Sequence, residues 1–144
     1  MKRVVISLLC LLISFNCFSE IRKDYYESGA LWIEINHEND KREGISKSYY
    51  ESGGLEEEVN FKNDKREGIT TFYYESGALQ GEVNFKNNEL EGIAKAYYES
   101  GALQVEMNYE NSKREGVTTY YNESGLLIKR ENYKNGKLVG EWTR

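Results

Sequence analysis

The chain has 144 residues, of which 39% are hydrophobic and 13% aromatic, with 12 tyrosines and no proline. This composition suits one globular or repeat unit and argues against two domains or a disordered polymer. Lys and Arg number 19 against 24 Asp and Glu, which gives a formal net charge of −5. Because phosphate binding needs a basic surface, this balance argues against nucleic acid as a partner.

The first 19 residues have the layout of a secretory signal peptide. The basic start MKR precedes the apolar run VVISLLCLLISF, which is too short for a comfortable membrane span. Cleavage after Ser19 places Cys17 at −3 and Ser19 at −1, which approximates the small-x-small rule. Lipidation of Cys17, as in a lipoprotein, stays open as a second interpretation. We expect export to the periplasm, the cell envelope or the extracellular space, with residues 20–144 as the mature repeat domain.

Five units of 24 residues fill the rest of the chain. Glycine recurs at two positions of the unit and asparagine at two others, as in Gly77, Gly92, Asn84 and Asn87. The segment Ile21–Asp24 before the first unit resembles the end of a sixth. Each unit begins at a tyrosine, and the five span residues 25–48, 49–72, 73–96, 97–120 and 121–144.

Each unit has the pattern of a β-hairpin. In the third unit Leu79, Val83 and Phe85 alternate with polar residues, and this period of two is typical of a strand. The segment ESG predicts a three-residue turn whose glycine adopts the left-handed conformation. The segment NDKRE and its equivalents predict a longer loop of five residues.

The predicted register places all apolar side chains on one face. With a five-residue loop, Phe85 lies opposite Ile93 and Tyr97 lies opposite Leu103. A two-residue turn would mix apolar with charged side chains, so the five-residue loop is preferred. One face then carries Leu, Val, Phe and Tyr, and the other carries Glu, Asn, Lys and the second tyrosine of each pair. The predicted fold is all-β, a single-layer meandering antiparallel sheet of about eleven strands built from tandem 24-residue β-hairpin repeats.

The last unit carries signs of a protected sheet edge. Glu131 and Glu141 stand where the third unit has Val83 and Ile93. Polar residues on an outer strand discourage pairing with another chain.

The repeated unit resembles a known family. Paired aromatic residues, an ESG turn, a leucine, an Asn followed by Phe or Tyr, and a later Glu-Gly are similar to the MORN repeat in its bacterial variant form, which includes the YwqK-type antitoxin family. The resemblance covers Ile21 to Arg144 and recurs five times. It implies one β-hairpin per unit in an elongated sheet, with roles in scaffolding, protein binding or lipid contact. Glutamates such as Glu58 and Glu82 depart from the usual MORN glycine pattern.

The sequence predicts no enzyme, no cofactor and no metal site. A kinase needs a Gly-rich phosphate loop, a strand lysine and acidic metal ligands in separate motifs, and these motifs are absent. His37, the one histidine, occupies a slot that aromatic residues fill in the other units, so we expect a sheet residue rather than a catalytic base. The repeated glutamates Glu58, Glu82 and Glu106 are expected about 10 Å apart, too far for one cation.

The loops do not predict binding to anionic membranes. Lys65 and Arg66 represent a Lys-Arg pair that recurs along one edge, but Asp64 and Glu67 flank this pair and neutralise it locally. A polybasic segment needs uncompensated positive charge to bind anionic lipids.

The apolar face has no second layer to cover it in this sequence. We therefore predict a non-enzymatic binding or scaffold module with a protein or peptide partner, self-association included, and a glycan as a further class of ligand. The alternative is a YwqK-type antitoxin or immunity-like protein that neutralises a toxin, although export would separate it from a cytoplasmic toxin. The predicted binding residues are Tyr49, Phe61, Tyr73, Phe85, Tyr97 and Tyr109.

Overall fold

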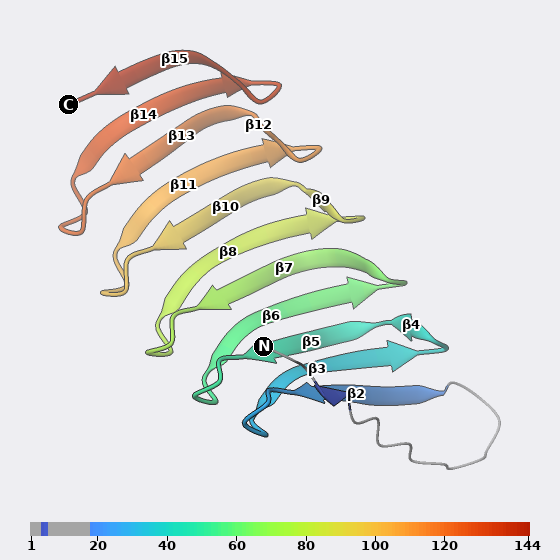
Figure 1. Ribbon diagram of the computed structural model, residues 1–144. Helices are drawn as coiled ribbons and strands as arrows, with labels where there is room; N and C mark the ends of the chain where they lie inside the picture. The colour runs from blue at the N-terminus through green and yellow to red at the C-terminus, as the bar shows by residue number, and fades with distance from the viewer. Residues whose placement is uncertain (1–3, 6–17) are drawn as a thin grey trace.

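The computed structural model describes residues 4–5 and 18–144, and its strands join one antiparallel sheet (Figure 1). The long strands lie side by side in chain order from β2 to β15, without a crossover. The described residues form no helix, so no second layer covers either face of the sheet within this part of the chain. The prediction of a single-layer meander of tandem hairpins is therefore confirmed.

Within the described residues, eleven strands are six to nine residues long, which agrees with the number expected. They are β2 (Ser19–Tyr25), β3 (Leu31–Glu38), β5 (Gly44–Tyr49), β6 (Leu55–Lys62), β7 (Lys65–Tyr73), β8 (Leu79–Lys86), β10 (Gly92–Tyr97), β11 (Leu103–Glu110), β13 (Gly116–Tyr121), β14 (Leu127–Lys134) and β15 (Lys137–Thr143). The two-residue strands are β1 (Val4–Val5), β4 (Lys41–Arg42), β9 (Glu89–Leu90) and β12 (Lys113–Arg114).

Most of the predicted leader lies outside the described residues. The predicted cleavage point after Ser19 falls at the start of β2, where Ser19 pairs with Glu38 of β3. A search of the described residues finds no helix of the length and hydropathy that a membrane span requires.

The ESG segment forms the predicted three-residue turn. In the third hairpin the Gly77 N–H donates to the Tyr74 carbonyl at 2.8 Å, and the Tyr74 N–H donates to the Ala78 carbonyl at 2.8 Å. Gly77 has a φ of +85°, in the left-handed region that glycine adopts without steric cost. The predicted pairing of Tyr97 with Leu103 is also confirmed.

The longer loop differs from the prediction. It is a two-residue turn in which Asn87 and Asn88 both have positive φ, 53° and 72°, and Lys86 pairs with Glu89 across it. Both central residues of a type I′ hairpin turn need this conformation, and asparagine tolerates it well. The prediction of a five-residue loop is wrong, because two consecutive residues at positive φ close the hairpin in a two-residue turn.

The two-residue turn decides which residues share a face. Phe85 lies opposite Leu90, and beyond Glu91 and Gly92 the register shifts by two residues, so that Glu82 lies opposite Lys95 and Ala96 lies opposite Gly81. A shift of two keeps the alternation, so Ile93 points to the face opposite Phe85, and the prediction that they lie opposite each other is wrong. The exposed row on that opposite face consists of Ile21, Ile45, Ile69, Ile93 and Val117, each 46–60% exposed.

The recurring Asn84 and its equivalents hold this register shift in place. The Asn84 side chain donates from Nδ2 to the Glu91 carbonyl at 3.0 Å, and the Glu91 N–H donates to the Asn84 carbonyl at 2.9 Å. Asn60 makes the same side-chain contact with Glu67 at 2.9 Å. These bonds satisfy backbone groups that the irregular ladder leaves without a strand partner.

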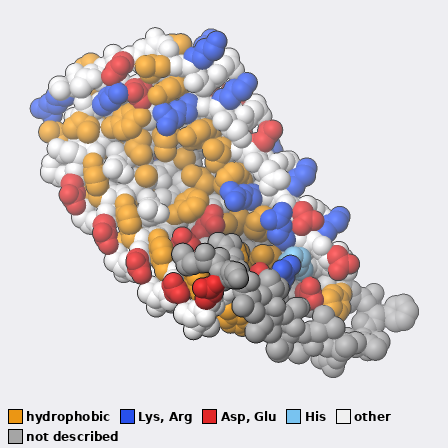
Figure 2. All heavy atoms as spheres, in the orientation of Figure 1, with side chains coloured by type: hydrophobic (Ala, Val, Ile, Leu, Met, Phe, Trp, Pro, Cys, Tyr) orange, Lys and Arg blue, Asp and Glu red, His pale blue; other side chains and the backbone are white. Residues whose placement is uncertain are grey.

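The sheet therefore has a hydrophobic face and a polar face. We define the hydrophobic face by cross-strand neighbours such as Val59, Thr70 and Val83, and the polar face by pairs such as Lys47 with Glu58. Hydrophobic side chains gather along the middle of the face seen in Figure 2, with acidic groups along one edge and basic groups toward the other. Every buried residue of the described chain lies on the hydrophobic face: Asp24, Ser46, Val59, Phe61, Thr70, Gly81, Ala94, Thr118 and Glu131.

Candidate functional site

A row of small residues runs along the middle of the hydrophobic face. Ser46, Thr70, Ala94 and Thr118 follow one another at intervals of 24 residues, one in every second long strand, and each is at most 5% exposed. Larger residues from the intervening strands stand beside them, because Ser46 pairs with Val59 and the others have equivalent neighbours. Because the small side chains are almost fully buried, their larger neighbours cover them, and a partner on this face would contact those neighbours.

Arginine and aromatic side chains form a second row, nearer the two-residue turns. The guanidinium carbon of Arg42 lies 4.3 Å from the centre of the Phe61 ring, in the next hairpin, and Arg66 lies 5.1 Å from Phe85 in the same relation. Stacking of a guanidinium on an aromatic face is favourable and leaves its N–H groups available at the edges. Leu90 occupies the arginine position in the middle loop, so the alternation is interrupted there.

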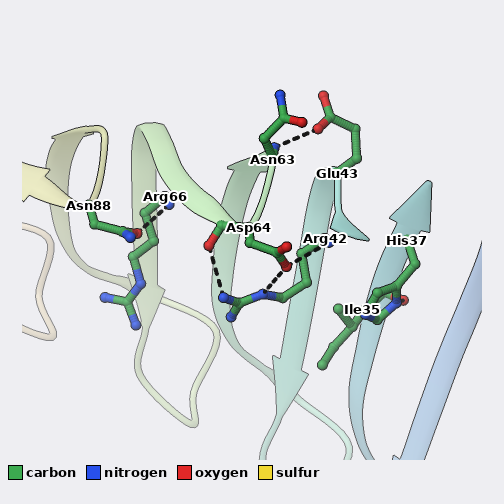
Figure 3. A network of polar contacts seen from close by, with 8 residues as sticks. All are labelled: Ile35, His37, Arg42, Glu43, Asn63, Asp64, Arg66 and Asn88. Atoms are coloured by element: carbon green, nitrogen blue, oxygen red, sulfur yellow. Dashed lines mark hydrogen bonds and ion pairs between the residues drawn. The ribbon is translucent and has the colours of Figure 1, made fainter. Parts of the chain in front are cut away.

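Polar contacts between successive loops fix this row (Figure 3). Asp64 Oδ1 accepts a hydrogen bond from the Arg42 backbone N–H at 3.0 Å and lies 3.3 Å from Arg42 Nε. Arg42 also donates from Nη2 to the Asp64 carbonyl at 2.9 Å. In the next loop Asn88 accepts from the Arg66 backbone N–H at 2.6 Å, and its side chain makes no contact with the Arg66 guanidinium (Figure 3). Arg42 is thus held by an acidic partner and Arg66 is not.

A hollow of about 180 Å³ opens in the hydrophobic face near its N-terminal end. Aliphatic residues of β3, Ile33 and Ile35, form one side, and Ser46 of β5 lies at its base. Glu57 is half-buried on the other side, and burial raises the pKa of its carboxyl, although the nearby Arg66 opposes this effect. The hollow therefore combines apolar walls with polar groups of both signs.

The opposite end of the hydrophobic face is closed by a polar network. Glu131 accepts hydrogen bonds from the hydroxyls of Tyr120 at 2.7 Å and Tyr133 at 2.9 Å, and it lies 2.6 Å from Lys129 Nζ. These contacts, with Lys129 contributing most, lower the pKa of Glu131 to about 2. Glu131, one of the two acidic residues expected to protect the edge, is buried on the hydrophobic face. The neighbouring Glu141 is exposed.

The six predicted binding residues do not share one surface. Phe61, Phe85 and Tyr109 belong to the hydrophobic face, where the row of arginine and aromatic residues runs. The tyrosines at the starts of the units point to the polar face, as the hydrogen bond of 3.0 Å from the Tyr49 hydroxyl to Glu34 shows. The strand alternation places Tyr73 and Tyr97 with Tyr49, because each directly follows a residue of the hydrophobic face. The prediction of one continuous aromatic surface is therefore wrong for Tyr49, Tyr73 and Tyr97.

Several residues of the hydrophobic face were not predicted from the sequence. Phe72 lies there opposite Gly81, and Tyr120 lies there opposite Val105. The equivalent position in β5 is Ser48, which is why the hollow opens beside that strand. The signal was present as variation inside an otherwise constant repeat, since this position alternates between large and small residues along the chain.

The single histidine and the acidic residues of the described chain form neither a catalytic nor a metal-binding cluster. His37 pairs with Arg42 in the sheet, and its Nδ1 lies 3.3 Å from the carbonyl oxygen of Ile35, a residue of the same strand. No cluster of three or more His, Cys, Asp or Glu residues within the described ranges is arranged to hold a metal ion.

Comparison with known families connects this geometry to a repeat type. The model of the MORN repeat variant matches five segments, residues 21–39, 42–63, 66–87, 90–111 and 114–135. The chain belongs to the MORN repeat variant family. No curated protein matches the chain.

The MORN segments explain how the sheet is divided. Each segment spans two strands joined by an ESG turn, as residues 66–87 span β7 and β8. Two residues separate successive segments: the second residue of the two-residue turn and the residue after it. The first segment begins within β2 and extends through β3, so Ile21–Asp24 belongs to the first matched MORN segment. β15 lies beyond the last matched segment and completes the sheet as its final strand.

Proposed function

We propose that this MORN repeat protein is an exported, non-enzymatic module that binds an extended protein or peptide segment along its hydrophobic face. The observation that carries the proposal is that all buried residues of the described chain lie on this one face, while no further layer of the described chain covers it. An apolar surface of this extent favours a partner, because leaving it in water is costly.

The row of arginine and aromatic residues supports a protein or peptide partner. Aromatic rings and guanidinium groups provide large contact area together with directional hydrogen bonds, and both are enriched where proteins bind each other. The net charge of −5 and the pairing of Arg42 with Asp64 argue against nucleic acids and anionic membranes as ligands.

A binding experiment can test the face directly, with one substitution on each face. Phe85→His introduces the residue found at the equivalent position 37, and Ile93→Glu places a charge in the exposed row of the polar face. We expect Phe85→His to weaken capture of the partner from the native cell envelope and Ile93→Glu to leave it unchanged. Thermal unfolding of both variants establishes that the fold is retained. Loss confined to Ile93→Glu would move the binding surface to the polar face and its exposed isoleucine row.

The second candidate function is a YwqK-type antitoxin or immunity-like protein. Membership of the MORN repeat variant family favours it, because the repeats resemble that group. The candidate requires a toxin partner in the compartment where the chain resides. Rescue of growth on co-expression with a toxin encoded beside this protein would favour this function, and its absence would favour the binding module.

A further inference from the structure

The hollow at the N-terminal end of the hydrophobic face forms where β5 contributes two serines. Ser48 pairs with Ile33 on one side and Glu57 on the other, and it stands where later units have Phe72, Ala96 and Tyr120. Because serine is small, the space between its neighbours stays open, with a volume of about 180 Å³. This is below the roughly 300–1,000 Å³ of pockets that enclose a drug-sized ligand, so the hollow suits a single residue of a larger partner.

Three polar groups at the hollow have unused hydrogen-bonding capacity. Ser46 is 5% exposed, and its buried hydroxyl has no hydrogen-bond partner. Neither a hydrogen bond nor a salt bridge joins the Glu57 carboxylate to another residue of the described chain. The Arg66 guanidinium lies over the Phe85 ring, and Figure 3 shows no contact between it and the neighbouring loop residue Asn88, which bonds only the Arg66 backbone. Buried polar groups are normally paired, so the buried Ser46 hydroxyl points to a missing ligand, and the partly exposed Glu57 and Arg66 side chains line the same hollow.

The charges of the hollow favour an uncharged ligand. Glu57 and Arg66 lie close enough to influence each other and carry opposite charges, while Arg42 is already neutralised by Asp64. A net charge on the ligand would leave one of these groups uncompensated in a partly desolvated place. A neutral group that both donates and accepts hydrogen bonds satisfies the carboxylate, the hydroxyl and the guanidinium together.

We propose that the hollow is a subsite for one uncharged amide unit that carries an aliphatic side chain, supplied by an extended peptide partner. The amide N–H donates to Glu57, the amide oxygen accepts from Ser46 and Arg66, and the aliphatic side chain packs on Ile33 and Ile35. The subsite deepens the proposed binding function and rests on it, since the peptide reaches the hollow along the hydrophobic face.

The experiment titrates the purified protein with N-acetyl-L-leucinamide, a neutral probe with two amides and an aliphatic side chain. We expect saturable changes in the NMR amide signals of Ser46, Ser48 and Glu57, and none of comparable size with the anion N-acetyl-L-leucine. Ser48→Phe fills the hollow with the residue that the next unit already has, and should abolish the response. Ala96→Phe makes the same change two units away and should retain it.

A second variant tests the hydrogen bonds separately from the shape. Ser46→Ala introduces the residue found at position 94. It should lower the affinity for the probe about three- to tenfold, because one hydrogen bond is lost. NMR shifts that do not saturate with the probe, or that persist in Ser48→Phe, would overturn the subsite. A response to N-acetylglucosamine without any response to the probe would overturn it as well. If the probe fails while Phe85→His still weakens partner capture, the binding function stands and the subsite does not.

Discussion

Tyr50 donates a hydrogen bond of 2.6 Å from its hydroxyl to the backbone carbonyl oxygen of Tyr73, in the next repeat. The second tyrosine of three other pairs makes the same bond at 2.7–2.9 Å, always to a residue 23 positions later. In the last unit Asn122 replaces this tyrosine and instead accepts from the Leu126 N–H of its own turn at 2.8 Å. The second tyrosine of a pair therefore joins neighbouring repeats. In the unit that begins at Tyr121, the bond of Asn122 stays within its own turn.

Removing one of these hydroxyls should weaken the array. Tyr74→Phe deletes the bond of 2.7 Å to the Tyr97 carbonyl and keeps the ring, so we expect the free energy of unfolding to fall by about 1 kcal/mol. Urea denaturation followed by circular dichroism measures the change. Tyr73→Phe is the matched control, because that hydroxyl makes no hydrogen bond to another residue of the described chain. An equal loss in both variants would contradict the role assigned to Tyr74.

Two glycines should respond in opposite ways to alanine. A Cβ at Gly81 would lie 2.9 Å from the Lys95 carbonyl oxygen, so Gly81→Ala must push two strands apart and should cost about 1–3 kcal/mol. A Cβ at Gly54 meets nothing closer than 3.5 Å, and other units have alanine there. Gly54→Ala should therefore be neutral or stabilise by about 0.4–1 kcal/mol through the unfolded state. Unchanged melting of Gly81→Ala would show that the strands accommodate the methyl group.

Acid should destabilise the C-terminal end through Glu131. Its folded-state pKa, about 2, is below the ordinary value of 4.5, so the stability it contributes is complete above pH 4.5 and is lost as the pH falls toward 2. Denaturation midpoints measured between pH 6 and pH 2.5 should fall less steeply in Glu131→Gln than in the wild type. Glu106→Gln, which removes an exposed carboxylate 3.8 Å from Lys95, should keep the wild-type slope.

Deleting one whole unit should leave a folded sheet. Removal of residues 73–96 joins equivalent positions of neighbouring repeats, and each hairpin contacts chiefly its neighbours. We expect a β-type circular dichroism spectrum and a denaturant m-value lower by roughly a fifth, because less surface is exposed on unfolding. A spectrum without β-structure would indicate that the sheet folds only at its full length.

Export predicts a defined N-terminus. Intact-mass analysis of protein made in the native host should place the first residue at Glu20, because the leader pattern points to cleavage after Ser19. A mass increase consistent with diacylglycerol and a start at Cys17 would favour the lipoprotein interpretation instead. Recovery of the chain with Met1 intact from the cytoplasm would contradict export.

The repeat, the hairpin, the ESG turn and the pairing of Tyr97 with Leu103 were predictable from the amino-acid pattern alone. These features depend on residues within a few positions of each other, and the chemistry of Gly77 or Asn87 acts locally. The order of the strands followed as well, because short connections keep successive strands adjacent.

Which side chains share a face, and what they contact, depended on the register between strands. The turn at Asn87 and Asn88 has two residues where five were predicted, and this odd difference in length places Ile93 on the face opposite Phe85. The unfilled hollow beside Ser48 and the tight approach of Lys95 to Gly81 depend on distances between strands, which no repeat pattern specifies. The sequence therefore predicted that one face of the sheet is hydrophobic. It did not predict which residues form that face, because a register shift of one position exchanges the two faces of a sheet.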